Sequence, residues 1–218
     1  MSIARPDNLF ITDLQEKFQT AGIEVKNSNL GQLPETTWFH YPSDYLGDIV
    51  HSLNVRSDNL YAESVLRLLS LSAHEKGSAE KGIDIIRKYW QNYEADSLEL
   101  FMYDGSGLAR NNKVSAKYLN CVLKETARDS LIGEYFVQTL PLAGKEGSVA
   151  TIMKHGELPG ELRLKSGSMS DVHAYAGYYT TPQNRYAIVV MINNYTCTRA
   201  QLKQKISTLL TQVLSKKE

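Results

Sequence analysis

The last third of the chain constrains its fold more than any other part, because its apolar residues follow strand-like rather than helical spacing. Three runs, 162–168, 172–180 and 185–193, alternate or run apolar and are rich in Tyr, Val and Ile. The stretch Thr181-Pro182-Gln183-Asn184 separates the last two runs with typical turn residues. The pattern predicts an antiparallel meander. A closing helix is expected after it, with an inner face made of Leu202, Ile206, Leu209, Leu210 and Val213.

Helical spacing predominates upstream of the meander. Apolar residues at helical intervals predict a first helix that starts near Leu9 and ends before Gly22. Ser43, Ser78 and Ser115 are favoured N-cap residues, and each precedes an apolar helical pattern. The helix after Ser43 is expected to end at a break over 54–58, and a second apolar helix is expected to follow that break.

Shorter elements complete this prediction. Strands are expected over 23–26, 36–41 and 98–103, and a short helix over 130–138. The helix after Ser78 is expected to turn four side chains inward, namely Ile83, Ile86, Tyr89 and Trp90. Together the elements predict an α+β fold, in which a helical cluster packs beside an antiparallel sheet of about three strands with a C-terminal helix.

Charge, apolar runs and cysteine content limit the kinds of partner and of targeting segment that the sequence supports. Basic and acidic residues number 24 each, so nothing favours a nucleic acid or an anionic membrane as a partner. No apolar run is long enough to span a bilayer. The first six residues lack the apolar core of a signal peptide, so a secreted origin would require a further segment upstream. Cys121 fits a small buried hydrophobe, and a disulfide between it and Cys197 stays open.

Two triplets carry the candidate chemistry. Ser57-Asp58-Asn59 lies in the break between two predicted helices, and Lys165-Ser166-Gly167 lies on the first strand of the meander. At average residue usage, Ser-Asp-Asn is expected roughly 0.03 times and Lys-[Ser/Thr]-Gly roughly 0.1 times in a chain of this length. Each triplet alone is weak evidence, and their order and placement strengthen it.

The residue types suit a serine–lysine acyltransferase. Ser57 could relay a proton beside a catalytic lysine, and Asn59 could hold the peptide group of a substrate. Lys165 and Ser166 could hold a substrate carboxylate through charge-assisted hydrogen bonds. Gly167 would let the substrate approach an exposed strand closely, and the backbone N–H of Ser168 could form one half of an oxyanion hole.

Plainer interpretations exist for each pattern. All three residue types of Ser57-Asp58-Asn59 are favoured N-caps, and Lys165-Ser166-Gly167 is also compatible with an ordinary exposed strand end. Ser78-Ala79-Glu80-Lys81 matches Ser-x-x-Lys, but it lies in a polar stretch and a helix cap is the better interpretation of Ser78. Asp104-Gly105-Ser106-Gly107 is interpreted as a tight turn. The five histidines show no metal-ligand spacing, and no glycine loop suits a phosphate, so no metal or cofactor is expected.

The segments around both triplets resemble D-alanyl-D-alanine carboxypeptidases/endopeptidases of the penicillin-binding protein 4 type, within the serine penicillin-binding protein and β-lactamase-like superfamily. The similar stretches are Val55–Glu63, Asp104–Leu108 and Leu164–Ser168. The resemblance covers nearly the whole chain and matches the C-terminal half of such an enzyme. It implies a partial β-lactamase/transpeptidase-like fold, a periplasmic enzyme acting on peptidoglycan stem peptides through an acyl-serine, and acylation by β-lactams.

The chain departs from this family in one respect. The nucleophile motif Ser-x-x-Lys, the strands before it and the inserted domains would all lie upstream of residue 1. Residues 1–218 are therefore expected to be the C-terminal part of a transpeptidase-like domain and to be inactive in isolation. Two alternatives stay open: a non-catalytic module that binds D-Ala peptides, or an assembly piece whose unpaired sheet edge joins another copy or the missing half. Carboxypeptidase and endopeptidase activities both stay open.

Overall fold

The structure is a computed structural model that describes residues 6–25, 40, 42–93, 99–153 and 158–216. The chain divides into two compact units, residues 1–43 and 44–218. In the first unit, helix α1 spans Pro6–Thr20 and leaves Leu9, Phe10 and Ile11 more than half exposed. Gly22 follows it at φ 72°, where the N–H of Gly22 bonds to the carbonyl of Gln19, so the predicted helix end is confirmed.

Neither short strand predicted in the first unit is present in its described residues. Residues 23–25 form no strand, so the prediction for 23–26 is wrong over its described part. The strand predicted over 36–41 lies outside the described residues, apart from residue 40, which is not in a strand.

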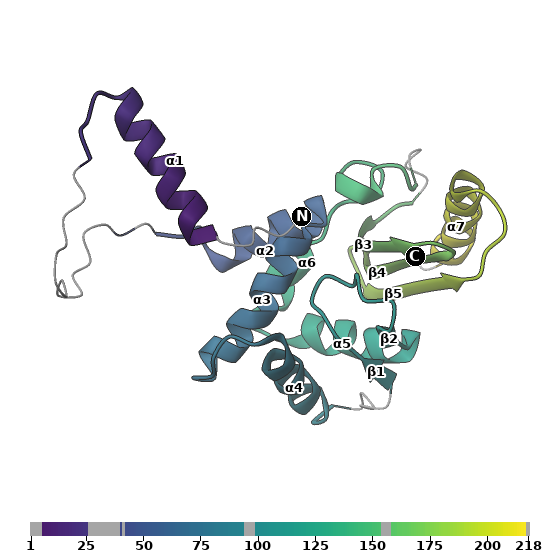
Figure 1. Ribbon diagram of the computed structural model, residues 1–218. Helices are drawn as coiled ribbons and strands as arrows, with labels where there is room; N and C mark the ends of the chain where they lie inside the picture. The colour runs from purple at the N-terminus through teal and green to yellow at the C-terminus, as the bar shows by residue number, and fades with distance from the viewer. Residues whose placement is uncertain (1–5, 26–39, 41, 94–98, 154–157, 217–218) are drawn as a thin grey trace. The chain divides into compact units, whose positions relative to one another are not determined.

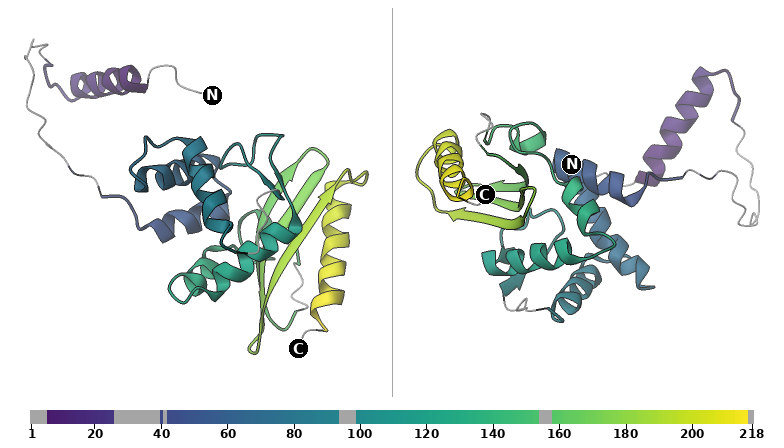
Figure 2. Two further views of the ribbon diagram at one scale, coloured as in Figure 1. Left: turned by 90° about the horizontal axis from the view of Figure 1, so that it is seen from below. Right: turned by 180° about the vertical axis from the view of Figure 1, so that it is seen from behind.

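The second unit is layered, with helices on one face of a sheet and a single helix on the other (Figures 1 and 2). The sheet consists of β3 (Glu161–Met169), β4 (Val172–Thr180) and β5 (Arg185–Asn193). Helix α7 (Arg199–Leu214) covers one face. The helical cluster on the other side comprises α2 (Leu46–Arg56), α3 (Asn59–Ser72), α4 (Ala79–Trp90), α5 (Ala116–Arg128) and α6 (Gly133–Thr139). A two-stranded ribbon, β1 (Leu100–Phe101) and β2 (Lys113–Val114), and a 3₁₀ turn, η2 (Gly147–Val149), complete the unit.

The sheet confirms the predicted meander. Its strands pair antiparallel in the order β3-β4-β5, and Lys165 lies opposite Ala176. The N–H of Thr181 bonds to the carbonyl of Asn184 at 2.8 Å and closes the turn between β4 and β5. The apolar pattern therefore predicted the position of each strand, because successive side chains of a strand point to opposite faces of the sheet and each face packs against a different layer.

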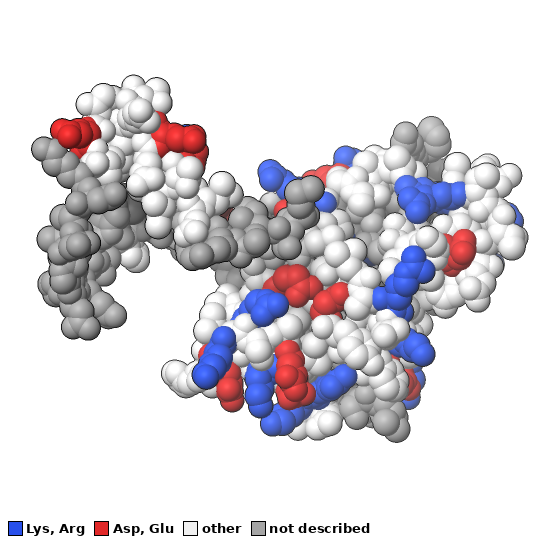
Figure 3. Space-filling view, viewed as in Figure 1, with Lys and Arg blue, Asp and Glu red and all other residues white. Residues whose placement is uncertain are grey.

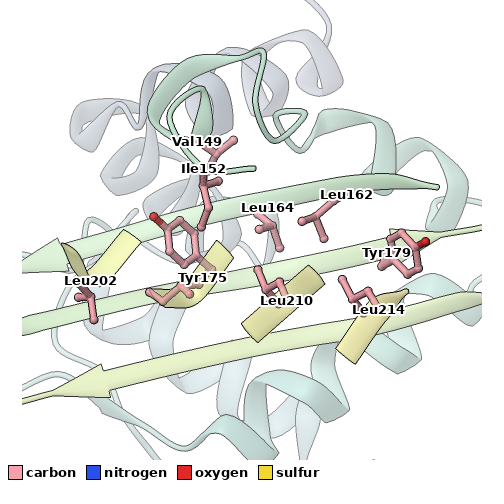
Figure 4. Packing of buried hydrophobic residues seen from close by; sticks show 10 residues of the cluster. Val149, Ile152, Leu162, Leu164, Tyr175, Tyr179, Leu202, Leu210 and Leu214 are labelled. Atoms are coloured by element: carbon pink, nitrogen blue, oxygen red, sulfur yellow. The ribbon is translucent and has the colours of Figure 1, made fainter. Parts of the chain in front are cut away.

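Each face of the sheet has its own core. On the α7 face, Tyr175 and Tyr179 of β4 are buried against Leu202, Ile206, Leu210 and Leu214 (Figure 4). On the opposite face, Tyr178 packs with Leu123, Val137 and Leu140, and its hydroxyl donates to the carbonyl of Leu123 at 2.7 Å. The three tyrosines of β4 thus pack the sheet against α7 on one face and against the helical cluster on the other.

The inner face of α7 was only partly predicted. Leu202, Ile206 and Leu210 are buried as expected, and Leu214 joins them. Leu209 and Val213 are 51% and 48% exposed, so their assignment to the inner face is wrong. The buried residues step by four positions along the helix, which rotates Leu209 and Val213 towards solvent.

Local hydrogen bonds decide the starts of the other helices. The Ser78 and Ser115 hydroxyls accept from the N–H groups of Lys81 and Tyr118, which confirms both caps. The Ser43 cap is wrong, because α2 begins after Tyr45, whose carbonyl is the first to accept helical bonds. Helix α6 begins three residues later than predicted, because the Asp129 carboxylate first bonds the N–H groups of Leu131 and Ile132 in a turn.

Other differences are small. The strand predicted over 98–103 is confined to Leu100–Phe101 within the described residues. Tyr89 is 52% exposed rather than inward, and it contacts Trp90 and Tyr93 in a surface cluster of rings. Cys121 is half-buried and forms no disulfide with Cys197.

Charged side chains of both signs lie on the visible face of the second unit (Figure 3). On the face shown in Figure 3, acidic and basic side chains are interspersed, in keeping with the zero net charge. Within the described ranges, none of the helices combines the length and the apolar character that a membrane span requires.

Candidate active site

The two triplets meet at a direct hydrogen bond. Helix α2 ends at Arg56, and Ser57 follows in the left-handed conformation at φ 56° and ψ 49°. This bend lets the Ser57 hydroxyl accept a hydrogen bond of 2.7 Å from the Nζ of Lys165 on β3. Two segments far apart in the sequence are thereby joined at one point.

The rest of the first triplet builds the start of α3. One carboxylate oxygen of Asp58 accepts from the N–H groups of Leu60 at 2.9 Å and Tyr61 at 3.1 Å. The N-cap interpretation is therefore right for Asp58, while Ser57 faces Lys165. Asn59 is the first residue of α3 and is exposed. Among the described residues, no hydrogen bond ties its side chain to Ser57 or Lys165, so its amide is available to a ligand.

Lys165 is a half-buried cation with no acidic partner among the described residues. Burial lowers the pKa of its ammonium group below the usual 10.5. Its Nζ also donates to the carbonyl of Ser166 at 2.8 Å. In the described part of the chain no carboxylate lies within ion-pair distance of it. A half-buried charge balanced only by neutral oxygens favours binding of an anion.

The outer edge of β3 is partly occupied by the chain itself. The N–H of Leu164 bonds to the carbonyl of Pro141, and the N–H of Ala143 bonds to the carbonyl of Leu162. In an antiparallel ladder, alternate residues direct both backbone groups to the same side. Ser166 and Ser168 therefore present their N–H groups to this same edge, beyond the point where the 141–143 segment ends its pairing.

Gly167 stands in open space beside this edge. A Cβ atom added there would meet nothing within 4 Å, so packing within the chain does not require a glycine at this position. Ser168 is exposed and lies opposite His173 in the ladder. The structure thus brings Ser57, Lys165 and Ser166 together, and leaves Asn59, Gly167 and Ser168 exposed around them.

Sequence reasoning missed one hydroxyl of this group. Ser148, on the η2 turn, is exposed, and its hydroxyl lies 2.7 Å from that of Ser166. Nothing in the spacing around Ser148 marks it, because the contact depends on how the 142–150 loop folds onto β3. The glycine before it, Gly147, was the one local signal of a tight turn.

The Asp104–Gly107 turn is attached to α3. The Asp104 carboxylate accepts from the N–H groups of Gly107 and Ala109, which confirms the tight turn. The Glu63 carboxylate of α3 accepts from the N–H groups of Gly105 and Ser106, both at 3.0 Å. This third similar segment therefore braces the helix that starts at Asn59.

Ser78 and Lys81 do not form a nucleophile pair. The Ser78 hydroxyl accepts from the backbone N–H of Lys81 at 3.1 Å, as an N-cap does, and Lys81 is exposed. Among the described residues, no group of three or more His, Cys, Asp or Glu side chains is arranged to hold a metal ion.

Residues 1–216 match the D-Ala-D-Ala carboxypeptidase 3 (S13) family. The chain belongs to this family. Among curated relatives, the D-alanyl-D-alanine carboxypeptidase DacB of Haemophilus influenzae is 27% identical over 206 residues, which are 90% of this chain and 42% of that protein. The D-alanyl-D-alanine carboxypeptidase of an Actinomadura species is 25% identical, over 83% of this chain and 36% of its own length. The chain therefore spans about two fifths of the curated relatives that it matches.

Two solved structures share this fold. Penicillin binding protein 4 from Haemophilus influenzae matches with a TM-score of 0.73 at 24% identity, over 94% of this chain and 48% of that one. A predatory endopeptidase of Bdellovibrio bacteriovorus, in complex with an immunity protein, matches with a TM-score of 0.61 at 16% identity, over 99% of this chain and 57% of that one. The expected partial transpeptidase-like α+β fold is therefore confirmed.

Proposed function

We propose that this chain supplies the proton-relay and substrate-binding half of a serine-type D-Ala-D-Ala carboxypeptidase or endopeptidase site that acts on peptidoglycan. The hydrogen bond between Lys165 and Ser57 carries this proposal, because it joins the two triplets into one site. Residues 1–218 would be the C-terminal part of a transpeptidase-like domain, and the compartment would be the periplasm.

Each residue has a role that its surroundings support. The Ser57 hydroxyl and the Lys165 ammonium would pass a proton to the leaving group. Lys165 and Ser166 would hold the substrate carboxylate, and the exposed amide of Asn59 would bind the peptide group. Gly167 leaves room for the peptide backbone, and the N–H of Ser168 would stabilise the developing oxyanion. The sequence supplies no Ser-x-x-Lys nucleophile, since Ser78 caps α4.

The 218-residue chain by itself is therefore expected to form no acyl-enzyme. It should be incubated with a fluorescent penicillin and examined on a denaturing gel, with penicillin binding protein 4 from Haemophilus influenzae as the positive control. The expected result is an unlabelled chain beside a labelled control. A covalent band that maps to Ser78 would sink the proposal.

A second candidate is a non-catalytic module that binds D-Ala-terminated peptides. The Lys165 ammonium favours it, because it contacts the Ser57 hydroxyl and the Ser166 carbonyl and has no carboxylate within ion-pair distance among the described residues. Such a cation suits a carboxylate ligand without any nucleophile. Calorimetry with a stem peptide ending in D-Ala-D-Ala should show binding that is lost in Lys165→Ala. No heat of binding at millimolar peptide would remove this candidate.

A third candidate is assembly through the sheet edge. Among the described residues, β5 pairs only with β4, and eight of its nine residues are half-buried. An apolar strand with one open edge can pair with a further strand, either from another copy or from a segment that carries the nucleophile.

A further inference from the structure

We propose that Ser148 is an additional carboxylate-binding residue that acts together with Ser166. This inference rests on the proposed function, because it concerns the same substrate carboxylate. It adds a group from a third segment of the chain, the η2 turn, to the two triplets.

The pairing of the two hydroxyls supports this role. Their oxygens are 2.7 Å apart, so one hydroxyl donates to the other and the proton of the second is free to point elsewhere. A carboxylate has two oxygens, and each can accept from one hydroxyl while the nearby Lys165 ammonium balances the charge. An anion would thus replace the weak bond between two hydroxyls with two charge-assisted bonds.

The loop around Ser148 holds that residue in place. Val149 and Ile152 are fully buried in the core between the loop, β3 and α7 (Figure 4). The N–H of Gly144 bonds to the carbonyl of Val149 at 3.0 Å, and the Glu146 carboxylate accepts from the N–H of Leu142 at 2.7 Å. The hydroxyl therefore extends from a turn whose neighbours are fixed, and little entropy would be lost when it binds a ligand.

The same loop also packs closely against the end of α2, just before the first triplet. Gly147 has φ 48°, and a Cβ atom there would lie 2.1 Å from the carbonyl oxygen of Val55. Only a glycine permits so close an approach to the end of α2, two residues before Ser57. Ser148 is thereby positioned relative to both Ser57 and Ser166.

A purely structural role for Ser148 makes a different prediction. Its side chain is exposed, so loss of the hydroxyl would leave no buried group without a hydrogen bond and should hardly affect folding. A binding role should instead appear only with ligands that end in a carboxylate. This difference allows a direct test.

The test compares two probes on the 218-residue chain by NMR chemical-shift titration: diacetyl-Lys-D-Ala-D-Ala as the free acid, and the same peptide as its C-terminal carboxamide. Ser148→Ala should weaken binding of the acid about tenfold, the loss expected for one hydrogen bond to a charged group, and should leave binding of the carboxamide unchanged. Ser148→Thr, which keeps the hydroxyl, should bind both probes as the parent does. Ser72→Ala, at an exposed serine at the other end of α3, is the matched control.

The outcomes separate the two proposals. If the parent prefers the acid and Ser148→Ala keeps that preference in full, the role of Ser148 is refuted and the proposed function stands. If the parent binds neither probe, or binds both equally, the carboxylate site itself is refuted, and the role of Ser148 with it.

Discussion

At the scale of single residues, Ser57 combines a useful hydroxyl with an unfavourable backbone. It is one of five non-glycine residues with positive φ among those described, and it is the one that bonds to Lys165. The left-handed conformation costs a residue with a Cβ about 1 kcal/mol. Strain of this kind often marks positions where function rather than stability selects the residue.

Two substitutions at Ser57 separate the strain from the hydrogen bond. Ser57→Ala and Ser57→Gly both remove the hydroxyl, but only glycine relieves the backbone. We expect the glycine variant to be more stable than the alanine variant by about 1 kcal/mol, measured by urea denaturation. Equal stabilities would show that the bend after α2 carries no strain.

Lys165 should make folding stability depend on pH in the alkaline range. Burial lowers the pKa of its ammonium group in the folded state, so the unfolded chain holds this proton more tightly. The free energy of unfolding should therefore rise as pH increases from the lowered value towards 10.5, relative to a Lys165→Met variant. Urea denaturation of both proteins across this window measures the difference. A difference that stays constant with pH would contradict the burial of the charge.

At the scale of elements, the contact between β4 and α7 contains a buried histidine. His173 is 3% exposed, its Nε2 lies 2.8 Å from the Tyr175 hydroxyl, and its Nδ1 has no hydrogen-bond partner among the described residues. Burial, and then the positive charges of Lys203 and Arg199 on α7, lower its pKa from the usual 6.5. The charged form is therefore disfavoured in the folded protein.

Acid should weaken this contact. Because the folded state resists protonation of His173, stability should fall as pH drops below about 6.5 towards the lowered pKa. His173→Gln, which cannot be protonated, should lose less stability over the same range. Thermal unfolding of both proteins between neutral and mildly acidic pH measures this. Equal losses in the two proteins would show that other groups cause the acid sensitivity.

The elements also show how far local patterns predict structure. The three strands and the caps at Ser78 and Ser115 were predicted from sequence, because alternation and capping depend on nearby residues. Leu209 and Tyr89 were misassigned, because their exposure depends on which neighbours the helices meet. In the site, the spacing of residues singled out Ser57 and Lys165, whereas Ser148 reaches Ser166 only through the fold of its loop.

At the scale of the whole molecule, the sheet edge at β5 should govern association. If copies pair there, sedimentation velocity should show dimers that increase with concentration. Amide hydrogen exchange of β5 should slow in parallel, while that of β4, already paired on both sides, should not change. A chain that stays monomeric at high concentration would exclude pairing between copies.

The outer edge of the sheet at β3 would accept an extended peptide in one orientation only. Because the 141–143 segment occupies the edge at Leu164, the stretch at Ser166 and Ser168, which pairs with no further strand among the described residues, is closed at one end. An extended peptide that continued this antiparallel pairing would have its carboxyl terminus, not its amino terminus, at the closed end beside Ser166. Strand geometry alone would therefore select which end of a ligand enters first, and a chain that continued past its terminal carboxylate would meet Pro141 instead of open edge.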